Sequence, residues 1–189
     1  MNQSKINVKE LKQVLNHVIE NNKMLQSKGL TPVAINVVGP AGLGKTSTIR
    51  QVGIEAGFKP ENVQMLNLSA LEEIGDLIGI PVVEYKMIKK VVQEDKTVAH
   101  SKWVSETAIN SYEKAGWLTS TESRMSYSIP EWIAGKTGPG ILILDDYTRA
   151  SQRFTQAVMQ LILEQAYGTW ELPKGWTIML SSNPDDGMY

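Results

Sequence analysis

The amino-acid sequence predicts an α/β fold, a three-layer sandwich in which helices cover both faces of a parallel sheet. Three observations lead to this prediction. An apolar run at residues 33–38 passes into a glycine-rich turn and then into a segment with helical spacing. Residues 141–144 are four consecutive aliphatic residues between glycines and two aspartates, which is typical of a strand buried on both faces. Strand-like and helix-like segments also alternate along most of the chain.

The first predicted helix begins after a capping box formed by Asn7 and Glu10 and runs to about Lys28. Its apolar residues repeat at helical spacing, namely Leu11, Val14, Leu15, Val18 and Ile19. Gly29 and Pro32 mark its end, and residues 33–38 form the first predicted strand.

The rest of the predicted sandwich follows from the same two periodicities. A helix after the glycine-rich turn buries one face and ends at Gly57; that face consists of Ile49, Val52, Gly53 and Ala56. Residues 63–68 predict a second strand and residues 177–180 a last one. Between them, the helix that carries Phe154, Ala157, Val158, Leu161 and Ile162 is predicted to stop at Gly168.

Residues 86–126 are polar and interrupt this alternation, so we interpret them as an inserted region. Residues 85–92 and 97–104 predict a β-hairpin, and residues 107–115 predict a helix. Two hypotheses remain open for its lysines, Lys86, Lys89, Lys90, Lys96 and Lys102. With Tyr85 and Trp103 they would form a basic surface for a strand of nucleic acid. Alternatively they belong to a solvated hairpin, because nearby acidic residues dilute the charge.

Composition excludes several classes of function. With 189 residues, 42% of them hydrophobic, the chain can bury a core, and we expect one α/β domain over residues 1–189. The absence of cysteine excludes disulfides, thiol catalysis and cysteine-ligated zinc. His17 and His100 occur in unrelated contexts, so we expect no metal site that uses both. A net charge of −1 provides no global electrostatic attraction for nucleic acid.

Neither a membrane segment nor a signal segment is evident in the sequence. No stretch approaches the ~18–20 apolar residues of a membrane span. The N-terminus also lacks an apolar signal segment. We therefore expect a cytoplasmic protein without a membrane partner.

The glycine-rich turn has the pattern of a loop that binds the phosphates of a nucleotide such as ATP. Its glycines allow successive N–H groups to point inward, where the positive end of the next helix adds to the attraction. The predicted nucleotide-binding residues are Gly39, Pro40, Ala41, Gly42, Leu43, Gly44, Lys45, Thr46 and Ser47. Lys45 would reach the β- and γ-phosphates, and the Thr46 hydroxyl would ligate Mg²⁺.

Three further residues turn nucleotide binding into a hypothesis of hydrolysis. Asp145 and Asp146 end the buried strand, at the edge where parallel sheets bind ligands. Asp145 would hold the Mg²⁺ ion and Asp146 would polarise the attacking water. Asn183 follows the last strand and would hold that water from the other side. The alternative is that Asp145 and Asp146 form a helix-capping turn and that Asn183 and Pro184 form an ordinary turn.

In this order the motifs resemble a AAA+ ATPase, specifically a MoxR-like member. The resemblance rests on the phosphate loop, Asp-Leu-Ile-Gly-Ile-Pro-Val-Val-Glu (76–84), Pro-Glu-Trp (130–132), Gly-Ile-Leu-Ile-Leu-Asp-Asp-Tyr-Thr-Arg-Ala (140–150), Gln-Leu-Ile-Leu (160–163), Leu-Pro-Lys-Gly-Trp (172–176) and Ser-Asn-Pro (182–184). It identifies the phosphate loop, the two aspartates and Asn183 with the family's Walker A, Walker B and sensor 1 motifs. It implies a P-loop NTPase fold, ATP and Mg²⁺ as cofactors, and homo-oligomeric rings, commonly hexamers, that remodel a protein or load a metal-containing partner.

The resemblance also carries expectations for the surrounding segments. Residues 78–83 correspond to a loop that faces the pore of the ring, or else they serve only loop packing, and residues 86–126 correspond to the family's insert in its second helix. Arg149 matches an arginine that acts across a subunit boundary or packs locally. The family's fifth strand, arginine finger, sensor 2 and helical lid would follow Tyr189, so we expect the α/β core with the lid absent and the first strand at an exposed edge.

The sequence therefore predicts an ATPase whose turnover is weak. Asp146 stands where the family usually has glutamate, and its side chain is one methylene shorter. Two alternatives are a nucleotide-gated binding module without significant turnover and a DNA-handling ATPase such as a helicase loader. The lysines of the inserted region are the only support for the latter.

Overall fold

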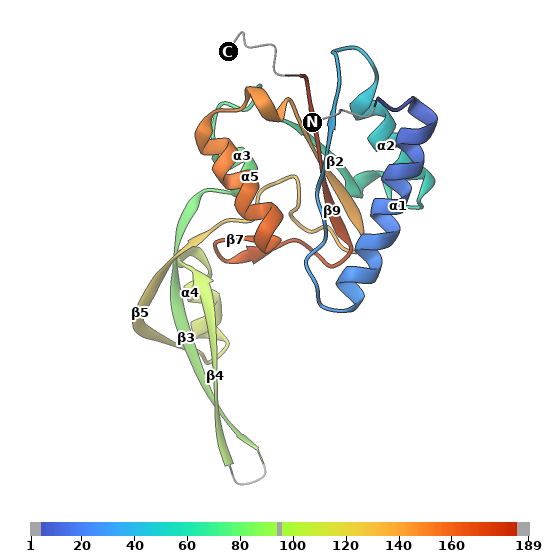
Figure 1. The fold of residues 1–189 in the computed structure, drawn as a ribbon. Coiled ribbons are helices and arrows are strands. Elements are labelled where there is room, and N and C mark those ends of the chain that lie inside the picture. The colour runs from blue at the N-terminus through green and yellow to red at the C-terminus, as the bar shows by residue number, and fades with distance from the viewer. Residues whose placement is uncertain (1–4, 94–95, 185–189) are drawn as a thin grey trace.

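The computed structural model describes residues 5–93 and 96–184, and at its centre lies a four-stranded parallel sheet (Figure 1). The strand order is β1-β9-β6-β2, with every neighbouring pair parallel. These strands are β1 (Ile35–Val38), β2 (Val63–Asn67), β6 (Gly140–Asp145) and β9 (Trp176–Ser182). The predicted α/β architecture around a parallel sheet is confirmed, and β1 lies at one edge of that sheet as expected.

Helices lie on both faces of this sheet (Figure 1). The α-helices are α1 (Val8–Ser27), α2 (Lys45–Glu55), α3 (Gly75–Ile78), α4 (Ile109–Lys114) and α5 (Gln152–Glu164). Single 3₁₀ turns are η1 (Pro60–Asn62), η2 (Glu106–Ala108) and η3 (Tyr147–Arg149). Helices α1 and α2 cover one face of the sheet, and α3 and α5 cover the other. Within the described residues, no helix combines the length and apolar character that a membrane crossing requires.

Two hydrophobic cores lie on the two faces of the sheet because successive side chains of a strand point to opposite sides. Ile141 and Ile143 of β6 pack with residues of α1 and α2, whereas Leu142 and Leu144 pack with residues of α3 and α5. All four side chains are fully buried. Burial of one such side chain contributes about 1.5–3 kcal/mol to folding, and β6 is one of the two inner strands of the sheet, beside β9.

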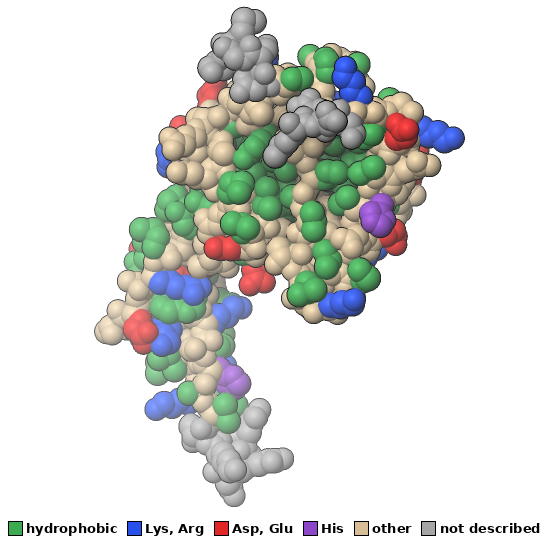
Figure 2. Space-filling view, viewed as in Figure 1, with side chains coloured by type: hydrophobic (Ala, Val, Ile, Leu, Met, Phe, Trp, Pro, Cys, Tyr) green, Lys and Arg blue, Asp and Glu red, His purple; other side chains and the backbone are tan. Residues whose placement is uncertain are grey.

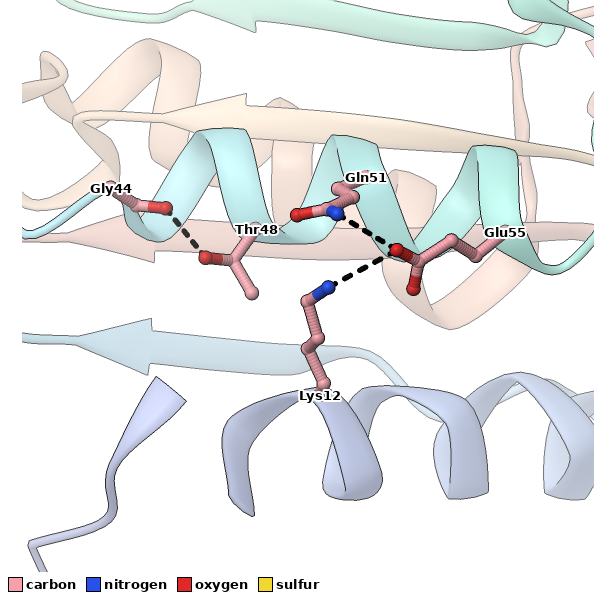
Figure 3. A network of polar contacts seen from close by, with 5 residues as sticks. All are labelled: Lys12, Gly44, Thr48, Gln51 and Glu55. Atoms are coloured by element: carbon pink, nitrogen blue, oxygen red, sulfur yellow. Dashed lines mark hydrogen bonds and ion pairs between the residues drawn. The ribbon is translucent and has the colours of Figure 1, made fainter. Parts of the chain in front are cut away.

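The first two helices form as the sequence predicts. The Asn7 side chain accepts a hydrogen bond from Glu10 N at 3.0 Å, and Glu10 Oε2 accepts one from Asn7 N at 2.8 Å, which completes the capping box. Lys12 Nζ lies 3.1 Å from Glu55 Oε1 and joins α1 to the end of α2 (Figure 3). This exposed ion pair contributes at most about 1 kcal/mol, so the apolar faces hold the helices together.

One helix end differs from the prediction. Helix α5 ends at Glu164, because Gln165 adopts the left-handed conformation with φ 54°. Gly168 instead occupies the turn between two short strands, β7 (Ala166–Tyr167) and β8 (Trp170–Glu171). Gly168 has a positive φ of 57°, which occurs both at helix ends and in hairpin turns. The presence of a glycine in the sequence therefore did not distinguish between the two.

A second, antiparallel sheet extends from the sandwich, and we call residues 81–127 the arm (Figure 1). Its strands are β3 (Pro81–Gln93), β4 (Lys96–Ser105) and β5 (Leu118–Tyr127), in the order β4-β3-β5. The predicted hairpin of β3 and β4 is confirmed, although Glu94 and Asp95 of its turn lie outside the described residues. The helix predicted at 107–115 consists of the 3₁₀ turn η2 followed by the short α-helix α4.

Strand β5 was not predicted from the sequence. Most of its side chains are exposed, and its sequence lacks the alternation of apolar and polar residues that signals a half-buried strand. Its pairing with β3 supplies the backbone hydrogen bonds that its sequence pattern does not reveal.

Candidate functional site

Three chain segments meet at one edge of the parallel sheet because the carboxyl ends of parallel strands lie together. The glycine-rich loop follows β1, the aspartate pair ends β6, and Asn183 follows β9. A hydrogen bond of 3.2 Å from Gly39 N to Ser182 O joins the start of the loop to the end of β9. The predicted site residues on these segments therefore lie near one another in the fold.

The loop adopts a backbone that glycine permits. Gly42 and Gly44 have φ of 79° and 71°, and a Cβ added at either position would meet no atom within 4 Å. Glycine is therefore needed at these two positions for its backbone conformation and not for lack of space, because the space beside them is open. Gly44 is the N-cap of α2, and its carbonyl accepts a 2.8 Å hydrogen bond from the Thr48 hydroxyl (Figure 3). The N-terminus of α2 thus lies directly after an exposed glycine loop, the arrangement that attracts anions.

Lys45 is the first residue of α2, and its ammonium group reaches across the loop. Nζ donates to Gly39 O at 2.7 Å, to Pro40 O at 3.1 Å and to Asn183 Oδ1 at 3.1 Å. An ammonium group has three donors, and all three have protein oxygens here. The contact with Asn183 joins two predicted site residues that are 138 positions apart.

Thr46 and Asp145 form a second contact between predicted site residues. The Thr46 hydroxyl donates to Asp145 Oδ2 at 3.1 Å and lies 3.5 Å from Ser181 Oγ. One hydroxyl oxygen and one carboxylate oxygen, both hard ligands, thus lie close enough to contact a common cation.

Asp146 follows Asp145 in the chain, but its side chain contacts Ser69 and not Thr46. Its backbone is left-handed, with φ 53° and ψ 37°, and its N–H donates to Asp145 Oδ1 at 3.1 Å. The Ser69 hydroxyl lies 3.3 Å from Asp146 Oδ2 and 2.8 Å from Asn67 Oδ1. Its single proton serves both acceptors, so the Asp146 carboxylate is only partly held.

Sequence reasoning missed Asn67 and Ser69 as members of this site. The signal was present, because Asn67 ends β2 and Ser69 follows two residues later, at the same carboxyl edge as the aspartates. The remaining predicted residues of the loop, including Ser47 in the first turn of α2, are exposed or half-buried around Lys45. Arg149 is exposed in η3, one turn beyond Asp146.

No protein-family model matches the sequence, and a comparison with curated proteins finds no significant match.

Two hollows lie away from the glycine-rich loop, on either side of α3. One, of about 840 Å³, is lined by Asp76, Tyr127 and Arg153, and the other, of about 530 Å³, by Ser128 and Trp132. Neither contains a residue of the loop. Backbone N–H groups on an open loop can bind phosphate without an enclosing cavity, so these hollows and the loop are separate features.

Four of the lysines of the inserted region, whose side chains the structure describes, do not share one face of the arm. The register of β3 and β4 puts Lys86 and Lys90 on one face of the arm and Lys89 and Lys102 on the other. Lys86 forms an ion pair with Glu122 at 2.8 Å, and Lys89 Nζ donates to Ala115 O at 2.7 Å. The hypothesis of a nucleic-acid surface therefore loses the single basic face on which it depends.

Proposed function

We propose that the chain binds Mg-ATP at residues 39–47 and hydrolyses it, with Lys45, Asp146 and Asn183 as catalytic residues. The observation that carries the proposal is the position of Lys45, whose ammonium contacts both the loop carbonyls and Asn183. A phosphate oxygen at the loop would replace one of these neutral acceptors. An ion pair with phosphate is stronger than a hydrogen bond to a carbonyl, which favours the exchange.

The contact between Thr46 and Asp145 supports a place for Mg²⁺. Their oxygens, 3.1 Å apart, are the ligand types that this ion prefers, and Mg²⁺ commonly takes one or two protein ligands beside phosphates and water. Bound there, the ion would neutralise charge that develops on the transferred phosphoryl group. The role of the protein is to hold Thr46 at the start of α2 and Asp145 at the end of β6.

Hydrolysis further requires that a water molecule be oriented toward the γ-phosphate. We propose that Asp146 polarises this water and that Asn183 holds it, as in the P-loop NTPase fold that the motifs resemble. Turnover is weak because the Asp146 carboxylate is one methylene shorter than a glutamate and shares the Ser69 hydroxyl. We further propose a cytoplasmic homo-oligomeric ring that remodels a protein partner.

The experiment compares Lys45→Ala with Arg50→Ala by isothermal titration of Mg-ATP. Both variants remove one cation from α2, but Arg50 is exposed and lies outside the loop. Loss of hydrogen bonds from a charged group costs about 1.5–3 kcal/mol, so Lys45→Ala should weaken binding about 10- to 150-fold. Arg50→Ala should bind as the unmodified chain does. Equal affinity of Lys45→Ala and the unmodified chain would overturn the proposal.

The second candidate is a nucleotide-gated binding module without significant turnover. The partly held carboxylate of Asp146 favours it, because such a group is poorly placed to polarise water. Released phosphate separates the two functions. Mg-ATP binding without phosphate release would select the binding module.

A further inference from the structure

One long strand edge of the arm is regular and unpaired within the described part of the chain. Strand β4 pairs with β3 through ten consecutive residue pairs without a register shift, and its other side has no neighbouring strand among the described residues. The arm extends away from the sandwich, so this edge is not covered by the parallel sheet or its helices (Figure 1). An edge of this kind presents backbone N–H and C=O groups that can pair with another chain.

The opposite edge of the arm is not equivalent. Strand β5 shifts register, since Tyr85 lies opposite Ser123 but Met87 lies opposite Thr119. Within that irregular stretch Glu122 N donates to the Ser120 hydroxyl at 3.2 Å, so a local contact uses a backbone donor. Bulges of this kind bend an edge and interrupt pairing, and α4 also packs against β5. The β4 edge is therefore the better template for an added strand.

The charge of β4 has one sign. The strand contains Lys96 and Lys102 and no acidic residue. Lys90 on the adjoining strand and Lys102 are exposed, and neither forms an ion pair within the described residues. The Lys102 ammonium lies 5.2 Å from the centre of the Tyr112 ring, which keeps it beside the sheet. In Figure 2 basic side chains are interspersed with hydrophobic ones along the arm.

We propose that the outer edge of β4 binds an extended acidic segment of a partner protein by strand addition. Side chains of an added strand alternate between the two faces of a sheet, and an exposed lysine lies on each face beside this edge: Lys102 of β4 on one face and Lys90 of the adjoining strand β3 on the other. A nucleic acid needs its basic contacts along one continuous groove, which this alternation does not provide. A second copy of β4 would bring like charges together, so the edge disfavours its own copy.

This binding does not depend on the proposed nucleotide site. The strands of the arm pair only with one another in the described residues, and the β4 edge lies far from the glycine-rich loop (Figure 1). The Lys45→Ala variant should therefore bind the acidic segment normally. Failure of one proposal leaves the other intact.

The first test measures fluorescence anisotropy of three labelled peptides of roughly eight residues, the length of an average strand or slightly more. One alternates glutamate with threonine and valine. The second replaces glutamate by glutamine, and the third keeps glutamate but carries N-methyl groups on alternate backbone nitrogens. The acidic peptide should bind at least tenfold more tightly than either of the others, because strand addition needs both backbone donors and charge.

The second test changes the protein. Lys90→Glu with Lys102→Glu should weaken binding of the acidic peptide at least tenfold, whereas Lys9→Glu with Lys174→Glu, an equal change of net charge at exposed sites on the sandwich, should not. Amide hydrogen exchange of the unmodified chain with saturating acidic peptide should slow in β4 and not in β5. Because this measurement uses the unmodified chain, a substitution that disturbs folding cannot affect its result.

Three results would overturn the proposal. Equal binding of the N-methylated peptide would reduce the attraction to charge alone. Tighter binding of a labelled oligo-dT strand, lost in the Lys90 and Lys102 variant, would assign the lysines to nucleic acid. No binding of any peptide would leave the lysines of β4 with a protective role against edge-to-edge association.

Discussion

Asp146 illustrates how a single backbone angle selects a residue type. Its φ of 53° lies in the left-handed region, where aspartate and asparagine are enriched because their short polar side chains bond locally. A glutamate at this position would reach farther but would lose that local advantage. The left-handed turn after β6 therefore favours the shorter aspartate side chain at this position.

Asp146→Asn keeps the shape of the side chain and removes its charge. If Asp146 polarises water, phosphate release should fall about 10²- to 10⁴-fold while Mg-ATP affinity changes little. A malachite-green assay for phosphate, run beside titration calorimetry, measures both. Asp146→Glu is the matched variant, for which we expect faster release and a stability loss of about 1 kcal/mol. Unchanged release in Asp146→Asn would remove this residue from the mechanism.

At the scale of elements, several hydrogen bonds fix residues 77–80, which connect α3 to the arm. Trp132 Nε1 donates to Leu77 O at 2.9 Å, and Trp170 Nε1 donates to Ile78 O at 3.0 Å. These bonds satisfy carbonyls at the end of α3 that the helix itself leaves free. The Ser128 hydroxyl accepts a hydrogen bond from Ile80 N at 3.0 Å. The indoles and Ser128 thereby fix the direction in which β3 leaves the sandwich.

Gly79 is the critical residue of this passage. Its φ is 84°, and an added Cβ would lie 1.8 Å from Ser128 O. Gly79→Ala should lower the free energy of unfolding by about 2–4 kcal/mol, through backbone strain and a clash with backbone that cannot move freely. Urea denaturation measures the loss.

Gly29→Ala provides the matched control for that substitution. Gly29 has a similar φ of 71°, but a Cβ there would meet nothing within 4 Å. Gly29→Ala should lower the free energy of unfolding only through backbone strain, by about 1–2 kcal/mol. Equal losses in the two variants would show that the contact with Ser128 is unimportant.

At the scale of the whole molecule, the chain combines a layered sandwich with a protruding arm. The candidate nucleotide site lies at the carboxyl edge of the parallel sheet. The arm is connected to the sandwich elsewhere, through α3 and residue 128. The β7–β8 turn adds a second connection, because the Thr169 hydroxyl is hydrogen-bonded to the Ser126 hydroxyl and accepts from Tyr127 N. The arm therefore has a defined base on the sandwich.

Mg-ATP should stabilise the whole chain if the proposed site binds it. At about 100 times its dissociation constant a ligand adds about 2.7 kcal/mol, which raises the melting temperature of a chain of this size by roughly 5–10 °C. Differential scanning fluorimetry with and without Mg-ATP measures the shift. Phosphate release that rises faster than protein concentration would support a ring. No shift would contradict the nucleotide proposal.

Some features of the chain could be predicted from local pattern alone. The capping box at Asn7, the aliphatic strand at 141–144 and the glycine loop each specify a conformation within a few residues, so α1, β6 and the loop were expected. The order of strands then implied that Lys45, Asp145 and Asn183 lie at one edge. Because parallel strands align their ends, motif order is enough to bring such residues together.

Other features depend on contacts between distant residues and were decided by the tertiary structure. Strand β5 forms only because β3 supplies a partner, and Gly168 turns a hairpin only because Gln165 has already ended α5. Ser69 reaches Asp146 across 77 positions, and the lysines of the arm divide between two faces through the register of β3 and β4. Local sequence encodes backbone preference. Pairing, register and the reach of one side chain to another are set only when the whole chain packs.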